Sequence, residues 1–245
     1  MKVKVGWPHT YLQFIRCFTP LLIVVTILTG CGNTKANVGS ALGSGMGESQ
    51  SGTLRTLSDL GLDQNLDLRA GPVDVPLDLR IPSLQVDAPV AGVGVTSDNV
   101  MDAPKGSADN PVWQKVFWYR GSGIPGDVST ATMAGHVDDE LGRPAAFARL
   151  KELRSGDLII VHDTRSDVDI NFQVTKVETY SVQQSAEARI LNQIYGDGPV
   201  SGKGPQQSSD GLSHLNLITC TGAYVQGSYN QRLVVYATNI TKNQQ

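Results

Sequence analysis

Three residues of this chain, Cys220, His136 and Arg232, have side chains that could together perform nucleophilic chemistry. A thiol becomes a strong nucleophile when it is ionised, and an imidazole can accept its proton or stabilise the thiolate. A guanidinium group near the sulfur favours the thiolate and can donate hydrogen bonds to the oxyanion that forms when a thiolate attacks an amide carbonyl. With ordinary pKa values of about 8.5 for cysteine and 6.5 for histidine, the ion pair would be on the order of 1% of the neutral pair.

The cysteine count draws attention to Cys220. The chain has three cysteines, of which Cys17 lies in an N-terminal segment expected to be removed and Cys31 is a candidate for lipidation. Exported proteins normally pair their cysteines in disulfides, so the single remaining thiol is either an inert buried group or a reactive one. His162 and His214 lie among strand residues without chemical context, and we interpret both as structural.

The N-terminus has the pattern of a secretory signal over residues 1–30. Basic residues precede an apolar run at residues 18–28, and this run is shorter than the about 20 residues needed to span a membrane. The run ends in "LTGC", which resembles the lipobox of bacterial lipoproteins, so Cys31 is expected to carry a diacylglyceryl group and to begin the mature chain. The alternatives are an uncleaved signal anchor or an accidental cysteine. In each case the rest of the chain is expected outside the membrane.

Composition predicts one folded domain behind a tether. The chain has 245 residues, of which 40% are hydrophobic, and its net charge of -3 includes no block of consecutive Lys or Arg, so no nucleic-acid partner is predicted. Residues 31–71 begin with a stretch rich in Gly, Ser and Asn that cannot bury enough apolar surface to fold, and we assign them as a flexible linker. The folded domain is expected at residues 72–242.

The folded part shows short apolar segments separated by Gly and Pro, which is typical of an all-β domain. A slip in the alternation predicts a β-bulge near Thr175. Brief helices are expected at residues 144–153 and 186–196, with a flexible loop at 198–211. The pattern favours a closed or nearly closed β-barrel, or a β-sandwich. The strands are expected at residues 76–82, 84–95, 115–120, 128–137, 157–163, 169–181, 214–220 and 231–240.

All three candidate residues are expected at strand boundaries. His136 follows one strand, Cys220 ends another, and Arg232 lies at the start of the last. The two-residue period of a strand puts Cys220 on the face opposite Leu217 and Thr219. A cysteine at the rim of a barrel can be open to solvent, although spacing alone does not bring the three residues together.

Three segments that contain these residues, "ATMAGHVDD", "LNLITCTG" and "YNQRLVVYAT", resemble the signature segments of sortases, the cysteine transpeptidases of bacterial cell surfaces. The resemblance covers residues 72–240, and "FWY", "PGD" and "AGHVD" make it closest to the class F type. One departure is "LNLITC", where the family pattern is close to "TLxTC".

This resemblance implies the eight-stranded sortase-type β-barrel with short helices in its connections. It also implies that Cys220 attacks the Thr–Gly bond of a Leu-Pro-x-Thr-Gly-like sorting motif to form a thioacyl enzyme. His136 would transfer protons, and Arg232 would hold the substrate carbonyl and its oxyanion. The implied partners are exported proteins with a C-terminal sorting signal and an amine of peptidoglycan or pilin. No cofactor is required, and the enzyme is expected at the outer face of the bacterial membrane, lipid-anchored or signal-anchored.

Two other functions stay open at this point. One is a different envelope cysteine transpeptidase similar to the L,D-transpeptidases, although their His-Gly and Ser-x-Gly-Cys segments are missing here. The other is a non-catalytic β-barrel lipoprotein in which Cys220 is inert.

Overall fold

The structure is a computed structural model that describes residues 56–97 and 99–240. The predicted signal peptide at residues 1–30, the lipidation candidate Cys31 and most of the predicted linker lie outside the described residues. Within the described part, no helix has both the length and the apolar character needed to cross a membrane.

Eight strands close into a barrel, as the sequence predicts. Each strand overlaps one of the expected segments, because alternating apolar residues in each can face a common interior. Short helices occur only in the connections. The strands are β1 (Val73–Ile81), β2 (Val86–Val93), β3 (Val116–Tyr119), β4 (Thr130–Gly135), β5 (Leu158–Asp163), β6 (Val168–Ser181), β7 (His214–Val225) and β8 (Ser228–Asn239).

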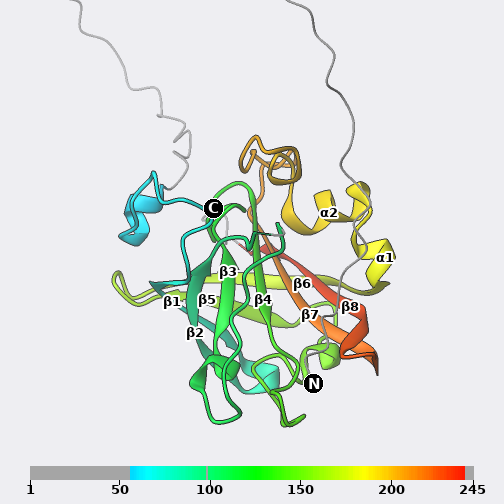
Figure 1. Ribbon diagram of the computed structural model, residues 1–245. Helices are drawn as coiled ribbons and strands as arrows, with labels where there is room; N and C mark the ends of the chain where they lie inside the picture. The colour runs from blue at the N-terminus through cyan, green and yellow to red at the C-terminus, as the bar shows by residue number, and fades with distance from the viewer. Residues whose placement is uncertain (1–55, 98, 241–245) are drawn as a thin grey trace, which may run out of the picture. The chain divides into compact units, whose positions relative to one another are not determined.

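The strands follow the order β1-β2-β3-β4-β7-β8-β6-β5 around the barrel, and β5 pairs with β1 to close it (Figure 1). The pairs β2–β3 and β4–β7 are parallel, and the other pairs are antiparallel. Because parallel neighbours cannot be joined by a tight turn, β2 and β3 are connected by the long segment 94–115. This topology makes β4 and β7, which are far apart in the sequence, direct neighbours.

The core fills the barrel interior with the inward-facing residues of the strands. Met133 of β4 and Leu217 of β7 are fully buried and belong to one continuous cluster. Each such side chain contributes about 1.5–3 kcal/mol through its removal from water. This packing fixes which face of β4 and β7 points outward.

The predicted β-bulge in β6 is confirmed. The register of β6 against β8 shifts between Val174 and Lys176, which leaves Thr175 as the extra residue. The Thr175 hydroxyl donates a hydrogen bond to the Tyr236 carbonyl at 3.0 Å, so the bulge is held by its own side chain.

The predicted helix at residues 144–153 is wrong as a helix, although its apolar positions are buried. The segment consists of turns and one 3-10 turn, Leu150–Glu152. The amide of Ala146 donates to the Trp113 carbonyl and that of Phe147 to the His136 carbonyl, at 3.0 and 2.9 Å. These amides bind neighbouring segments in place of helical partners, while Phe147 and Leu150 enter the core.

Two α-helices lie together beside the barrel, in the connection from β6 to β7 (Figure 1). They are α1 (Val182–Ser185) and α2 (Ala188–Tyr195), and α2 confirms the helix expected at residues 186–196. Ile190 and Ile194 are the buried residues of α2 and pack with Val234 of β8. The remaining helical segments are 3-10 turns: η1 (Leu57–Leu60), η2 (Pro82–Leu84), η3 (Pro111–Gln114), η4 (Leu150–Glu152) and η5 (Pro199–Ser201).

The end of the predicted linker packs on the barrel, so residues 56–71 are not part of a free tether. Leu60 is buried in the core cluster. The buried Arg120 donates hydrogen bonds to the carbonyls of Asp67 and Ala70 at 3.1 and 2.8 Å. The Gly- and Ser-rich composition that predicts a tether belongs to the preceding residues, whereas this stretch has scattered leucines, of which Leu57 and Leu62 also pack against the core.

Candidate active site

The parallel pairing of β4 and β7 places His136 beside Cys220. The register runs from Thr130 opposite His214 to Ala134 opposite Ile218. One residue further, the Thr219 hydroxyl donates a hydrogen bond of 2.8 Å to the Gly135 carbonyl, which maintains the register of the two strands. The next residues along the two chains are His136 and Cys220.

These two residues lie on the outer face of the barrel, opposite the core. Thr132 and Asn216 share this face, and both donate to the Ile194 carbonyl at the end of α2, at 2.7 and 2.8 Å. Because side chains alternate along a strand, every second residue shares this face. Along β4 these are Ala134 and then His136, and along β7 they are Ile218 and then Cys220. The helix therefore covers one end of this face, while His136 and Cys220 are only partly buried.

Aromatic rings and one carbonyl hold the His136 side chain. Its ring contacts the edges of Trp113 and Phe117, with centroids 4.8 and 5.6 Å apart. His136 Nε2 lies 2.8 Å from the Pro104 carbonyl oxygen. Because a carbonyl oxygen only accepts hydrogen bonds, Nε2 carries a hydrogen, and Nδ1 is the nitrogen that can accept a proton from a neighbour.

Burial lowers the pKa of His136 below its ordinary value, and the positive charge of Lys105 lowers it further. The hydrogen bond to Pro104 and the negative charge of Asp138 oppose this decrease. The net direction favours the neutral imidazole in the resting protein. A neutral imidazole beside a thiol can act as a base, and its protonated form can then act as an acid.

Arg232 lies on the other side of Cys220. In the antiparallel pairing of β7 and β8, Cys220 is directly opposite Arg232. Cys220 is a free thiol and is partly exposed. In the strand register, Cys220 therefore lies between His136, which follows β4, and Arg232 on β8.

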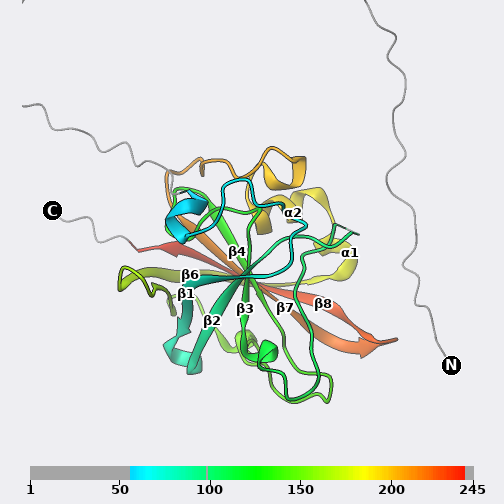
Figure 2. The ribbon, with the colours of Figure 1, turned by 60° about the vertical axis from the view of Figure 1, so that its left-hand side comes forward.

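The expectation that Cys220 and Arg232 lie at strand boundaries is wrong. Both strands continue beyond them, β7 to Val225 and β8 from Ser228, and form a hairpin that extends past the neighbouring strands (Figure 2). The turn residues Gln226 and Gly227 both have positive φ, 51° and 84°, as a two-residue hairpin turn requires. The strands expected from the sequence end at residue 220 and begin at residue 231.

The Arg232 side chain runs back along its own strand. Its Nη1 donates to the Tyr229 carbonyl at 3.1 Å and to the Gln231 carbonyl at 2.9 Å. Its positive charge also acts on Tyr195 at the end of α2, whose pKa is nevertheless raised to about 12 by burial and by the neighbouring Tyr119. The Arg232 guanidinium is therefore held by carbonyls of its own strand, close enough to the end of α2 for its charge to act on Tyr195.

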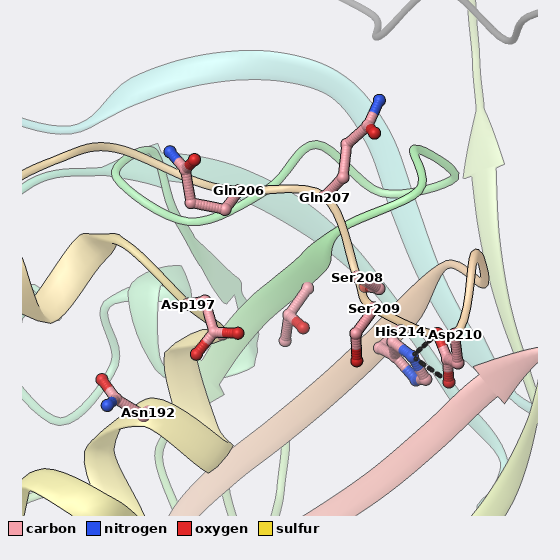
Figure 3. A pocket seen from close by; sticks show the side chains of 10 residues that line it. Asn192, Asp197, Gln206, Gln207, Ser208, Ser209, Asp210 and His214 are labelled. Atoms are coloured by element: carbon pink, nitrogen blue, oxygen red, sulfur yellow. Dashed lines mark hydrogen bonds and ion pairs between the residues drawn. The ribbon is translucent and has the colours of Figure 1, made fainter.

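A separate polar cavity lies at the other end of the same strand pair. It has a volume of about 170 Å³ and includes Thr130 and His214, the first residues of β4 and β7. His214 Nε2 lies 3.0 Å from a carboxylate oxygen of Asp210 in its wall (Figure 3). None of the three candidate residues lines this cavity.

The described residues include no group of three or more His, Cys, Asp or Glu side chains placed to hold a metal ion. The acidic residues that follow His136 instead have protein partners. Asp139 pairs with Arg143, and Glu140 accepts a hydrogen bond from the Ala108 amide at 2.7 Å.

Several residues that shape the site were not identified from the sequence. Pro104 and Trp113 come from the 94–115 connection, for which no element was predicted, and the buried Thr219 was assigned only to a face. Asn216, which departs from the sortase pattern, anchors the end of α2. One signal in the sequence points to Asn216: it is a polar residue predicted on the same strand face as the candidate nucleophile Cys220.

Comparisons with known proteins give a family match over most of this region. The family described as sortase domain matches residues 79–240. No curated protein matches the chain.

Solved structures with similar folds include several sortases. A sortase D5 transpeptidase of Clostridium perfringens is 16% identical, with 67% of this chain and 78% of that chain covered and a TM-score of 0.44. A lid mutant of sortase A from Corynebacterium diphtheriae is 16% identical, with 77% and 80% covered and a TM-score of 0.47. Sortase C1 of Streptococcus agalactiae is 17% identical, with 75% and 72% covered and a TM-score of 0.45.

Proposed function

Because this chain belongs to the sortase family of cysteine transpeptidases, we propose that it cleaves a Leu-Pro-x-Thr-Gly-like sorting motif at the Thr–Gly bond and transfers the threonyl group to an amine. The observation that carries this proposal is the position of Cys220 between His136 and Arg232 on three adjacent chain segments. Each of the three side chains supplies one of the functions that thiol-based acyl transfer needs.

In the proposed reaction, the Cys220 thiolate attacks the threonine carbonyl carbon. The Arg232 guanidinium donates hydrogen bonds to the carbonyl oxygen as negative charge develops there. Protonated His136 then gives its proton to the departing glycine amine, and the C–N bond breaks to leave a thioester on Cys220. The incoming amine loses a proton to His136 and displaces the sulfur, which restores the thiol site.

The lowered pKa of His136 favours its neutral form in the resting protein. In the proposed reaction, the neutral imidazole takes the proton of the Cys220 thiol as the thiolate forms, which gives the imidazolium that later protonates the glycine amine.

The proposed partners are exported proteins that carry a C-terminal sorting signal, with an amine of peptidoglycan or of pilin as the acceptor. We assign the chain to the class F type on the segments "FWY", "PGD" and "AGHVD". The proposed catalytic domain spans residues 72–242 and needs no cofactor for this chemistry.

We further propose a lipid anchor at Cys31 and a location at the outer face of the bacterial membrane. A tether would raise the local concentration of the enzyme around substrates held at the same membrane. Labelling with a lipid precursor tests the anchor. Label should be incorporated into the full chain and be lost in Cys31→Ala, and label retained by that variant would contradict the anchor.

The first test of function uses the compact unit Ser49–Gln245 with a panel of Leu-Pro-x-Thr-Gly-type peptides and oligoglycine. Mass spectrometry should detect a thioacyl adduct on Cys220 and a new amide product. Cys220→Ala should lower product formation to the background rate and retain the melting temperature to within a few degrees, because the thiol is only partly buried. Product formation by Cys220→Ala would refute the proposed mechanism.

The same experiment distinguishes the remaining alternatives. A β-barrel binding lipoprotein would give no adduct with any peptide, and its Cys220 would resist alkylation. A cross-linker similar to the L,D-transpeptidases would act on peptidoglycan stem peptides and not on sorting peptides.

A further inference from the structure

A hydrogen bond links the segment after His136 to the hairpin formed by β7 and β8. The Tyr229 hydroxyl, on β8, donates to Asp138 Oδ2, and the two residues are 91 positions apart in the sequence. Both side chains are partly buried. Because β7 lies between β4 and β8 in the barrel, this bond reaches across β7.

A bulge in β7 gives the hairpin the shape that makes this contact possible. The register of β7 against β8 shifts between Thr221 and Tyr224, with Gly222 at a φ of 85°. A Cβ at Gly222 would lie 2.4 Å from the Asn230 side chain, so this position requires glycine. After the bulge, Tyr224 and Tyr229 face each other, with ring centroids 5.1 Å apart.

Tyr229 also lies close to the reactive groups. Its backbone carbonyl accepts the hydrogen bond from Arg232, and the charge of Cys220 acts on its hydroxyl. The bond to Asp138 and burial raise the pKa of Tyr229 to about 12, so the hydroxyl stays protonated and remains a donor at neutral pH.

Asp138 is two residues beyond His136, in a segment whose backbone is fixed on both sides. The His136 carbonyl accepts from the Phe147 amide at 2.9 Å, and the Val137 carbonyl accepts from the Ala145 amide at 3.2 Å. The charged groups that act on His136 are Asp138 from this segment, which raises its pKa, and Lys105 from the 94–115 connection, which lowers it. Among the titratable groups of the adjoining strands, Cys220 of β7 and Arg232 of β8 lie at the register positions next to His136.

We propose that Asp138 and Tyr229 are a positioning pair, in which the Tyr229 hydroxyl holds the Asp138 carboxylate beside His136 and fixes the His136 segment against the strands that carry Cys220 and Arg232. The proposal rests on the proposed function. The pair touches no reacting atom. It sets the relative position of the imidazole and the thiol, and it supplies the negative charge nearest in sequence to the imidazolium.

Two substitutions separate the charge of the pair from its hydrogen bond. Asp138→Asn keeps an oxygen that can accept from Tyr229 but removes the negative charge. Tyr229→Phe keeps the charge and removes the donor. Tyr224→Phe is the matched control, because it removes a hydroxyl from the exposed partner ring of the same hairpin.

The full chain is assayed in detergent for kcat, KM and the pH dependence of kcat/KM. We expect Tyr229→Phe to lower kcat about tenfold with little change in KM, because a displaced catalytic group slows the chemical step. Asp138→Asn should shift the acid limb of the profile to lower pH, because the charge that raises the pKa of His136 is gone. Tyr224→Phe should match the parent in all three quantities.

A second measurement needs no substrate. Histidine labelled with ¹³C at Cε1 gives one NMR signal for each of the four histidines, and His136→Gln identifies the signal of His136. The midpoint of this signal should move to lower pH in Asp138→Asn and stay in place in Tyr224→Phe. This result supports the pair even if no tested peptide is cleaved, so failure of the proposed function and failure of the pair are distinguishable.

The pair is refuted if Asp138→Asn leaves both the acid limb and the NMR midpoint of His136 unchanged. It is also refuted if kcat in Tyr229→Phe falls only in proportion to the folded fraction, measured by thermal unfolding, because the bond would then be merely structural.

Discussion

The two ends of the β4–β7 pair each carry a histidine, and the two histidines have opposite surroundings. At one end, both ring nitrogens of His214 have polar side-chain partners, Thr238 at 3.2 Å and Asp210 at 3.0 Å. At the other end, the His136 ring lies among aromatic edges with a backbone carbonyl on Nε2. Side-chain partners face both nitrogens of His214, whereas a backbone carbonyl faces Nε2 of His136 and leaves Nδ1 as the nitrogen that would transfer protons in the proposed reaction.

The polar cavity around His214 is not the proposed active site. That cavity gathers carboxylates, amides and hydroxyls around His214, but the His214 ring nitrogens face Thr238 and Asp210. The reactive end instead has a thiol, an imidazole and a guanidinium on adjacent segments. Catalysis by acyl transfer depends on the types and the order of the groups more than on the size of a cavity.

The largest expected effect comes from replacing each histidine in turn. His136→Gln should lower kcat/KM for peptide transfer by about 10³-fold or more, because positioned acid–base catalysis contributes roughly 10²–10⁴-fold. His214→Gln should change kcat/KM by less than about threefold, because its contacts lie at the other end of the strands. Equal losses in the two variants, at equal folded fraction, would contradict the distinction between the two ends.

The hydroxyl groups at the two ends provide a smaller and sharper test. Thr219→Val removes the buried bond to the Gly135 carbonyl that aligns His136 with Cys220. We expect a loss of about 1–3 kcal/mol in the free energy of unfolding and about a tenfold decrease in kcat.

Thr238→Val is the matched control, since it removes the hydroxyl bonded to His214. It should cost stability without lowering kcat. Urea unfolding and peptide-transfer assays on both variants make the comparison, and a similar decrease in kcat for Thr238→Val would argue against a positioning role of Thr219.

The smallest expected effect concerns pH. Burial lowers the pKa of His136, so the acid limb of kcat/KM should lie below about pH 6.5, the ordinary value for histidine. Lys105→Gln should move this limb to higher pH by a few tenths of a unit at most, because water and salt screen a charge on an exposed side chain. A shift to lower pH would mean that the charge of Lys105 does not act on His136 as described.

The lowered pKa of His136 also makes the free energy of unfolding depend on pH. Folding favours neutral His136, so its contribution to the free energy of unfolding is complete above about pH 6.5 and is lost as the pH falls through the lowered pKa. The urea midpoint of His136→Gln should therefore depend less on pH in this range than that of the parent.

Alternation of apolar residues predicted the strands because each strand has one face in the core, as β7 does with Leu215 and Leu217. Apolar spacing did not predict residues 144–153 correctly. Their buried residues have the spacing of a helix, but the segment consists of turns. The reason is that amides such as that of Phe147 bind distant carbonyls, which no local pattern records.

The candidate site was predictable to the extent that its reactive groups lie in recognisable strand segments. Cys220, His136 and Arg232 were identified from the sequence, and the structure places them on adjacent segments. Pro104 was not identifiable, because its contact with His136 uses only a backbone carbonyl. The extension of β7 and β8 was missed because Gly222 and Gly227 are typical of loops as well as of a bulge and a turn.

The parallel pairing of β4 and β7 also determines when the site can exist during folding. The hydrogen bond from Thr219 to Gly135 spans 84 residues, and Arg232 belongs to the last strand of the chain. Contacts between residues so distant in sequence form late, since closing long loops costs entropy before the contacts are gained. The three candidate groups therefore come together only after nearly the whole domain has been made and folded. A chain truncated before β8 contains Cys220 but lacks Arg232, so the proposed site exists only in the complete domain.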